Sequence, residues 1–267
     1  MNLETDIQTL KINKQFERFQ NYENVLPSWT IRFHNIHNNT YQNIIDKQRQ
    51  IGRYQFAQDT NVFLIYDMEN GNCLRIAEDF LSADCYVNGE IDQDIYELIR
   101  HGYKYRAIVD DVLIIHSSAI NCHDKGIMFI GNSGAGKSTQ AELWKEHRDA
   151  LVINYDQNAV LIQDDQIIVN GTPWGGKEQY YTCENVPLYA IAYVQKAFYN
   201  KAVLLGKGDA FSTVLLNNYI FPFNRCIEEK YFNLISEIIS RIPVYMLFCT
   251  KGIASVKTIE DIINMNN

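Results

Sequence analysis

The sequence predicts an α/β protein whose strands and helices build a mixed sheet around a P-loop, preceded by a smaller β-rich unit. Three observations support this prediction. A glycine-rich motif lies between an apolar run at 126–130 and a helix-forming run at 139–145. After residue 112, hairpin-like pairs of apolar runs mix with helical segments, which is typical of an α/β sandwich. Before residue 90, short strands are separated by Asn-Gly turns. We place the two units at residues 1–106 and 107–267.

The N-terminal unit begins with about fifty polar, weakly patterned residues. Alternating or apolar runs then predict strands at 28–33, 61–67, 72–77 and 83–87. Asn70-Gly71 indicates a hairpin turn between the second and third of these runs, and Asn88-Gly89 is a second turn signal. Helical spacing over 92–104 predicts a helix that links this unit to the rest of the chain.

In the C-terminal unit, the runs 112–116 and 126–130 predict a hairpin whose second strand leads into the glycine-rich motif. A strand at 151–154 follows, and 159–162 with 166–169 form a hairpin that turns at Asp164-Asp165. The remaining pattern predicts a strand at 188–194, helices at 210–219 and 228–241, a strand at 243–249 and a helix at 256–264.

Composition narrows the class of protein. With 267 residues, 46% of them hydrophobic, the chain can bury a sizeable core. A net charge of −8 argues against nucleic-acid binding, and no apolar run is long enough to span a membrane. The N-terminus is acidic and lacks a secretory signal. Six cysteines without a C-x-x-C pair suggest reduced, mostly buried thiols. We therefore expect a cytoplasmic protein.

The glycine-rich motif fits G-x-x-x-x-G-K-[ST] without a mismatch. Its glycines let backbone N–H groups turn toward phosphate oxygens, and the following helix adds the positive end of its dipole. The lysine would reach the β- and γ-phosphates, and the serine hydroxyl would ligate Mg²⁺. We expect a nucleoside triphosphate to be held by Gly131, Asn132, Ser133, Gly134, Ala135, Gly136, Lys137, Ser138 and Thr139.

Two further residues can carry phosphoryl-transfer chemistry. Asp156 follows the predicted strand at 151–154, where a carboxylate can ligate Mg²⁺ or accept the proton of an attacking hydroxyl. The alternative is a turn or helix-capping aspartate. His116 ends an aliphatic run and could contact the γ-phosphate or orient Asp156, or it could be a core histidine. His123 lies in a polar turn, where we expect it to be exposed.

At these residues the chain resembles the HPr kinase/phosphorylase group and its relatives with the phosphoenolpyruvate-carboxykinase type of P-loop. The resemblance covers roughly residues 107–267 and includes Ser133 and Gly134 within the motif. His116 stands fifteen residues before Gly131, and Asp156 eighteen residues after Ser138, where the family has functional residues. It implies an HPr-kinase/carboxykinase type of fold, ATP and Mg²⁺. The family usually has two acids where this chain has Tyr155-Asp156.

The stretch 171–178 is similar to a glycine-rich active-site loop in small kinase-like relatives of this family. On that resemblance, Lys177 would neutralise the transferred phosphate and Trp174 would contact the acceptor. HPr kinases have a Glu-Arg-Gly element near here where this chain has 169–171, so we assign Glu178 as a metal ligand. A tryptophan-containing loop can also simply close a hydrophobic edge.

The aromatic segment 217–225 could contact an acceptor or adenine, or could cap the sheet. Arg225 in this segment is a candidate arginine finger.

These features predict an ATP- and Mg²⁺-dependent kinase that phosphorylates a hydroxyl of a protein, a peptide or a small alcohol. Lys137 and Asp156 would be catalytic with the help of His116, and the N-terminal unit would shape the acceptor side. The alternative is a nucleotide-dependent switch without phosphotransfer. A carboxykinase is a third reading, but the chain is much shorter than those enzymes. HPr kinases are hexamers, so a homo-oligomer is compatible with the resemblance.

Overall fold

A computed structural model describes residues 2–5, 29–36, 48–59, 62–178, 180–221 and 223–265. The chain divides into two compact units. The first consists of residues 1–110 together with 220–230, and the second of residues 111–219 together with 231–267. Most of the first fifty residues, including the predicted start of a strand at residue 28, lie outside the described part.

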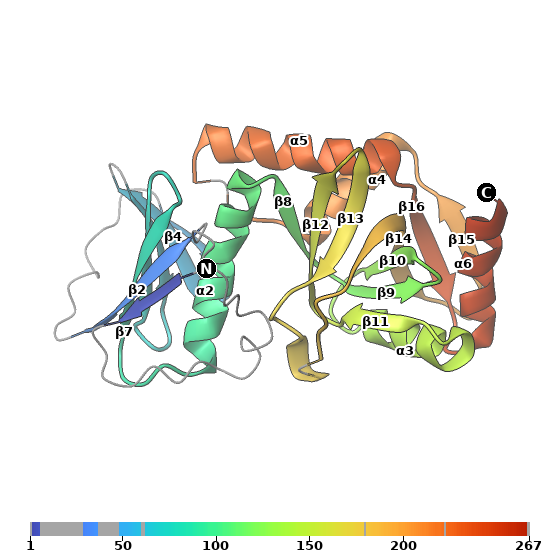
Figure 1. The fold of residues 1–267 in the computed structure, drawn as a ribbon, viewed down its shortest axis with the longest axis horizontal. Coiled ribbons are helices and arrows are strands. Elements are labelled where there is room, and N and C mark those ends of the chain that lie inside the picture. Colours follow the sequence, from blue (N-terminus) through green and yellow to red (C-terminus); the bar gives the residue numbers. More distant parts are fainter. Residues whose placement is uncertain are drawn as a thin grey trace. The chain divides into compact units, whose positions relative to one another are not determined.

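The described part of the first unit contains a mixed sheet and helix α2 (Figure 1). Its strands run in the order β1-β2-β7-β6-β5-β4-β3, in which β1, β2 and β7 are parallel and the other neighbours are antiparallel. The elements are β1 (Asn2–Thr5), β2 (Thr30–Asn35), β3 (Gln48–Ile51), β4 (Tyr54–Asp59), β5 (Val62–Asp67), β6 (Cys73–Ala77), β7 (Ser82–Val87) and α2 (Gln93–Val109).

Local sequence explains two features of this unit. Gly71, with a φ of 74°, allows the turn that joins β5 to β6, which confirms the predicted hairpin. Asn88-Gly89 does not form a second hairpin, because β7 pairs with β2 and the chain continues into α2. The Asp92 side chain accepts hydrogen bonds from the backbone N–H groups of Asp94 and Ile95, so it caps the start of α2.

The core of the first unit is rich in aromatic rings. The Phe223 ring lies 4.6 Å from the Tyr105 ring and 4.7 Å from the Phe63 ring, centroid to centroid. The Tyr105 hydroxyl donates a hydrogen bond of 2.8 Å to the Phe221 carbonyl. The aromatic segment at 217–225 therefore contributes to the core of the first unit, and the prediction that it caps the P-loop sheet is wrong.

The second unit contains a mixed nine-stranded sheet with helices (Figure 1). Its described strands are β8 (Val112–His116), β9 (Ser118–Cys122), β10 (Lys125–Ile130), β11 (Leu151–Asn154), β12 (Gln157–Gln163), β13 (Gln166–Gly171), β14 (Asn185–Lys196), β15 (Lys201–Leu204) and β16 (Val244–Cys249). The helices are α3 (Lys137–Arg148), η1 (Gly176–Glu178), α4 (Lys207–Asn217), α5 (Arg225–Arg241), whose first turns belong to the first unit, and α6 (Ile253–Met265).

The strand order of this sheet is β11-β9-β10-β14-β13-β12-β8, with β16 beside β14 and β15 beside β16. Strands β10, β14 and β16 are parallel, whereas β9 is antiparallel to both β10 and β11. The α/β class and the mixed sheet are thus confirmed. The predicted pairing of 112–116 with 126–130 is wrong: the hairpin partner of β10 is β9, and β8 pairs with β12.

The helices cover an apolar core. Helix α3 packs on β9, β10 and β11 and against α6, and the core there includes Phe129, Trp144 and Ile259. All six cysteines are free thiols, and four of them are buried. No helix in the described part of the chain is both long and apolar enough to cross a membrane.

Candidate functional site

The sheet topology brings the 131–136 loop and Asp156 to one edge. Because β10 and β11 are both antiparallel to β9, their carboxyl ends lie together where β9 begins. Phe129 pairs with Ser118 and Asn154 pairs with Ala119. One strand therefore separates the loop from Asp156, a spacing of about 10 Å between the outer strands. The strand that ends before Asp156 is therefore not adjacent to the strand that precedes the loop.

The loop depends on glycine at three positions. Gly131, Gly134 and Gly136 have φ angles of 143°, 75° and 112°, which other residues rarely adopt. Gly136 is the N-cap of α3, and no side chain caps the helix. The first N–H groups of α3 are therefore available to an anion, as a helix start that binds phosphate requires.

Lys137 lies over this loop. Its side chain is buried, and its Nζ atom donates hydrogen bonds to the carbonyl oxygens of Gly131 at 2.9 Å and Asn132 at 3.4 Å. Burial lowers the pKa of Lys137, and the charge of Asp156 acts in the opposite sense. The ammonium group and the Asp156 carboxylate thus lie within electrostatic reach of each other.

The first turn of α3 also presents Ser138. Its side chain is half-buried, and its hydroxyl has no hydrogen-bond partner among the described residues. Gln140, two residues further on, is buried and donates hydrogen bonds to Ser255 Oγ at 3.1 Å and Cys249 Sγ at 3.4 Å. These bonds tie the start of α3 to the chain that follows β16.

The Asp156 carboxylate and the His116 ring lie within hydrogen-bonding distance of each other. His116 Nδ1 lies 3.1 Å from Asp156 Oδ1 and 3.2 Å from the Gln157 side-chain nitrogen. Nδ1 can donate to Asp156 only when it carries a hydrogen, and can accept from Gln157 only when it does not. The His116 side chain is 39% exposed, so it is not a core histidine.

A buried polar network holds the Asp156 backbone. Asn154 Oδ1 accepts hydrogen bonds from the N–H groups of Asp156 at 2.8 Å and Gln157 at 3.1 Å, and its amide donates to the Thr172 carbonyl at 2.8 Å. The Thr172 hydroxyl donates to the Gln157 carbonyl at 2.8 Å. Sequence analysis missed Asn154, Gln157 and Thr172. A signal was present, because 154–158 is a polar run directly after an apolar strand.

The loop that contains Trp174 passes beside Asp156. Trp174 is buried, and its carbonyl accepts a hydrogen bond of 3.3 Å from the Gln157 N–H group. A Cβ atom on Gly176 would lie 2.9 Å from Asp156 Cβ. Lys177 is exposed on η1, and the side chain of Glu178 lies outside the described part. The structure thus places the backbone of this loop against the carboxylate.

Three further residues singled out in the sequence have contacts of other kinds. Arg225 belongs to the first unit, is exposed, and pairs with Glu229 at 2.6 Å. Tyr155 stands where the resemblance implies a second acid. It is buried and donates a hydrogen bond to Glu142 of α3. His123 is exposed, as expected from its polar turn.

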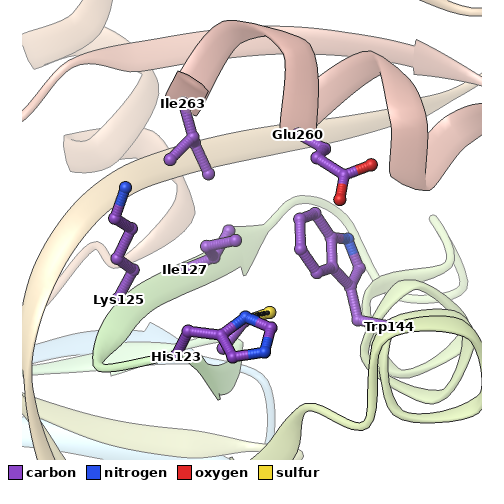
Figure 2. Close-up of a pocket in the computed structure, with 7 residues that line it drawn as sticks. His123, Lys125, Ile127, Trp144, Glu260 and Ile263 are labelled. Atoms are coloured by element: carbon purple, nitrogen blue, oxygen red, sulfur yellow. Dashed lines mark hydrogen bonds between the residues drawn. The ribbon is translucent and has the colours of Figure 1, made fainter. Parts of the chain in front are cut away.

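A pocket of about 230 Å³ lies at the opposite end of β10 (Figure 2). Ile127, Ile263 and the Trp144 ring form apolar walls, and Lys125, His123 and Glu260 add polar groups. None of the residues predicted to bind phosphate or to act in catalysis lines this pocket. It is therefore separate from the candidate site.

Comparisons with known proteins add a distant likeness of fold. No protein-family model matches the sequence, and no curated protein matches it. Among solved structures, the chain is similar to the Hpr(Ser) kinase/phosphatase from Coxiella burnetii, with 8% sequence identity and a TM-score of 0.34. The match covers 58% of this chain and 99% of that one. At this TM-score the likeness carries no argument about the site or its chemistry.

Proposed function

We propose that the protein binds a nucleoside triphosphate, ATP in the first instance, on residues 131–139 and transfers its γ-phosphate to a hydroxyl acceptor. The observation that carries this proposal is the convergence of Lys137, Asp156 and His116 at one sheet edge. Burial lowers the pKa of Lys137 and the charge of Asp156 opposes this effect, while Asp156 Oδ1 lies 3.1 Å from His116 Nδ1. A phosphate-binding lysine and a carboxylate near it are parts that phosphoryl transfer needs.

Phosphate binding would replace contacts that the loop now makes with itself. The Lys137 ammonium is desolvated and rests on two carbonyl oxygens of the loop. Phosphate oxygens are stronger acceptors for a buried cation than neutral carbonyls. The N–H groups at the uncapped start of α3 add further donors. Binding would therefore compensate the desolvation of Lys137.

The donor set suits Mg²⁺. Among the described residues no three His, Cys, Asp or Glu side chains gather as a metal site. Mg²⁺ with a bound nucleotide needs no such cage, because it takes phosphate oxygens and water with one or two protein ligands. Ser138, whose hydroxyl has no partner among the described residues, and Asp156 would hold it. When bound, Mg²⁺ would supply charge neutralisation on the phosphates.

Asp156 would accept the proton of the attacking hydroxyl. As the hydroxyl oxygen bonds to the γ-phosphorus, its proton passes to the carboxylate and the β–γ bridging oxygen leaves with the nucleoside diphosphate. His116 would orient the carboxylate through Nδ1, at 3.1 Å, and the network of Asn154 and Thr172 would keep the Asp156 backbone in place. The loop with Trp174 and Lys177 would lie on the acceptor side, because its backbone packs on Asp156 at Gly176.

The test follows γ-labelled ATP in the presence of Mg²⁺ and a fractionated cell extract. Label is measured separately in macromolecules, small molecules and free phosphate, with wild type and Asp156→Asn. We expect label in one acceptor fraction, lost by at least a hundredfold in Asp156→Asn while ATP binding persists. Label found nowhere except in free phosphate, despite tight ATP binding, would contradict the proposal and favour a nucleotide-dependent switch.

A further inference from the structure

The connection between β14 and β15 carries the most exposed large apolar side chain that the structure describes. Phe198 is fully exposed, at 105% of its reference area, and its neighbour Tyr199 is 55% exposed. Burying an aromatic ring is strongly favourable, so a ligand that covered Phe198 would gain binding free energy. The position of this turn relative to the phosphate loop indicates which ligand could do so.

The turn lies along the same sheet edge as the 131–136 loop. Strand β14 is parallel to β10, with Tyr193 opposite Ile130, and a Cβ atom on Gly131 would lie 3.0 Å from the Val194 carbonyl oxygen. Phe198 follows Val194 by four residues, at most about 13 Å of extended chain. That reach matches the length of a nucleotide between its phosphates and its base.

The chain after β16 joins this turn. Strand β16 lies between β14 and β15, so residues 197–200 cross its carboxyl end. Asn200 exchanges hydrogen bonds with Thr250: its amide nitrogen donates to Thr250 Oγ1 at 3.1 Å, and its Oδ1 accepts from the Thr250 N–H at 3.0 Å. Gln140 of α3 bonds Cys249 and Ser255 on either side of this loop. The phosphate loop, the 197–200 turn and the 250–252 loop are therefore one connected edge.

Positive charge along this edge favours the binding of a polyanion. The chain as a whole carries a net charge of −8, yet 186–208 contains three lysines and no acid, and the 250–252 loop adds Lys251. Lys196, Lys201 and Lys251 are all exposed. On the other side of the loop lie Asp156 and His116. A triphosphate whose γ-phosphate faces Asp156 must extend its nucleoside toward β14 and β16.

We propose that the nucleoside of the bound triphosphate lies over the 197–200 turn and the 250–252 loop, with its base stacked on Phe198. This proposal rests on the proposed function. Stacking on an aromatic ring is tolerant of the base, because every base has a π-face. The Asn200 side chain could otherwise hydrogen-bond the edge of a base, but its amide nitrogen and oxygen are both hydrogen-bonded to Thr250. The site therefore discriminates poorly between adenine and guanine.

Calorimetric binding of three Mg²⁺ complexes tests the proposal: ATP, GTP and inorganic tripolyphosphate. The variants are Phe198→Ala, Phe198→Trp and, as a control, Leu216→Ala, which truncates another exposed apolar side chain on α4 at 76% exposure. We expect Phe198→Ala to weaken ATP and GTP about tenfold and to leave tripolyphosphate unchanged. Phe198→Trp should retain wild-type affinity, Leu216→Ala should have no effect, and wild-type affinities for ATP and GTP should agree within about threefold.

Three results would overturn the proposal in distinguishable ways. If the wild type binds ATP but Phe198→Ala binds it equally well, the base does not stack on Phe198 although the proposed function stands. The same holds if Phe198→Ala only changes the mass of the protein in sedimentation, because Phe198 would then contact a second copy. If the wild type binds none of the three ligands, the proposed function itself fails.

Discussion

Gly176 lies so close to Asp156 that a Cβ atom on the glycine would be 2.9 Å from Asp156 Cβ and 3.4 Å from its carboxyl carbon. Real Cβ atoms do not approach one another so closely. The backbone of the loop at Gly176 thus packs directly against the Asp156 side chain, and a side chain at residue 176 would prevent this contact. The φ of Gly176, 68°, is a second reason for glycine at this position.

Substituting Gly176→Ala should therefore displace Asp156 or the loop. We expect phosphoryl transfer to fall about tenfold or more, because small displacements of catalytic groups are costly, while the Kd for MgATP stays within about twofold. The matched control is Gly89→Ala, which has a φ of 104° but no atom within 4 Å of the added Cβ. Equal losses of transfer in both variants would show that backbone strain alone, and not contact with Asp156, causes the effect.

Lys137→Met should separate stability from ligand binding. Burial lowers the pKa of this lysine, which means that the folded protein disfavours its charged form. Removing the charge should leave the melting temperature unchanged or higher. It should also weaken MgATP binding about tenfold to a hundredfold, because charge-assisted hydrogen bonds to phosphate are lost. Lys145→Met, at an exposed position of the same helix, is the control for the change of residue type. A destabilised Lys137→Met protein would contradict this account.

Gly102→Ala should destabilise the first unit although alanine favours helices. The added Cβ would lie 2.4 Å from Leu74 Cδ2 and 3.1 Å from Trp29 Cη2, and both side chains are buried. Overpacking costs about 1–3 kcal/mol and the helix gains about 1 kcal/mol. We expect the free energy of unfolding to fall by about 1 kcal/mol in chemical denaturation. Gly208→Ala in α4, where nothing lies within 4 Å, should not lower it; a loss there as well would argue against a steric cause.

Glu260→Gln should reveal a pH-dependent link between α3 and α6. Two hydrogen bonds from Arg148, both 2.6 Å, lower the pKa of Glu260 below its ordinary value of 4.5. The pair therefore stabilises the fold above that value, and its contribution is lost as the pH falls through the folded pKa. Thermal unfolding should show a lower melting temperature for Glu260→Gln than for wild type near pH 7, with the difference shrinking as the pH falls below 4.5. A difference independent of pH would mean that packing, and not charge, is responsible.

Local chemistry made part of the fold predictable. The helix predicted from 139–145 and observed as α3, the hairpin at Asp164-Asp165 and the hairpin at Asn70-Gly71 each follow from residues adjacent in sequence. Strand β9 was missed because the polar residues Ser118 and Asn121 interrupt its apolar pattern. Its pairing with β11 joins segments that are distant in the sequence. The same limit hid the network around Asp156, since Asn154 and Thr172 are eighteen residues apart.

The first unit draws on a segment that the ribosome makes late. Phe223 packs on Phe63 and Tyr105, yet more than a hundred residues of the second unit are synthesised between Tyr105 and Phe223. A fragment that ends at residue 110 would lack these rings and the Phe221 carbonyl that accepts from Tyr105. The half of the protein that emerges first therefore cannot complete its core until the chain has grown past residue 230. During synthesis, part of the aromatic core of the first unit therefore stays exposed until residues 220–230 have been made.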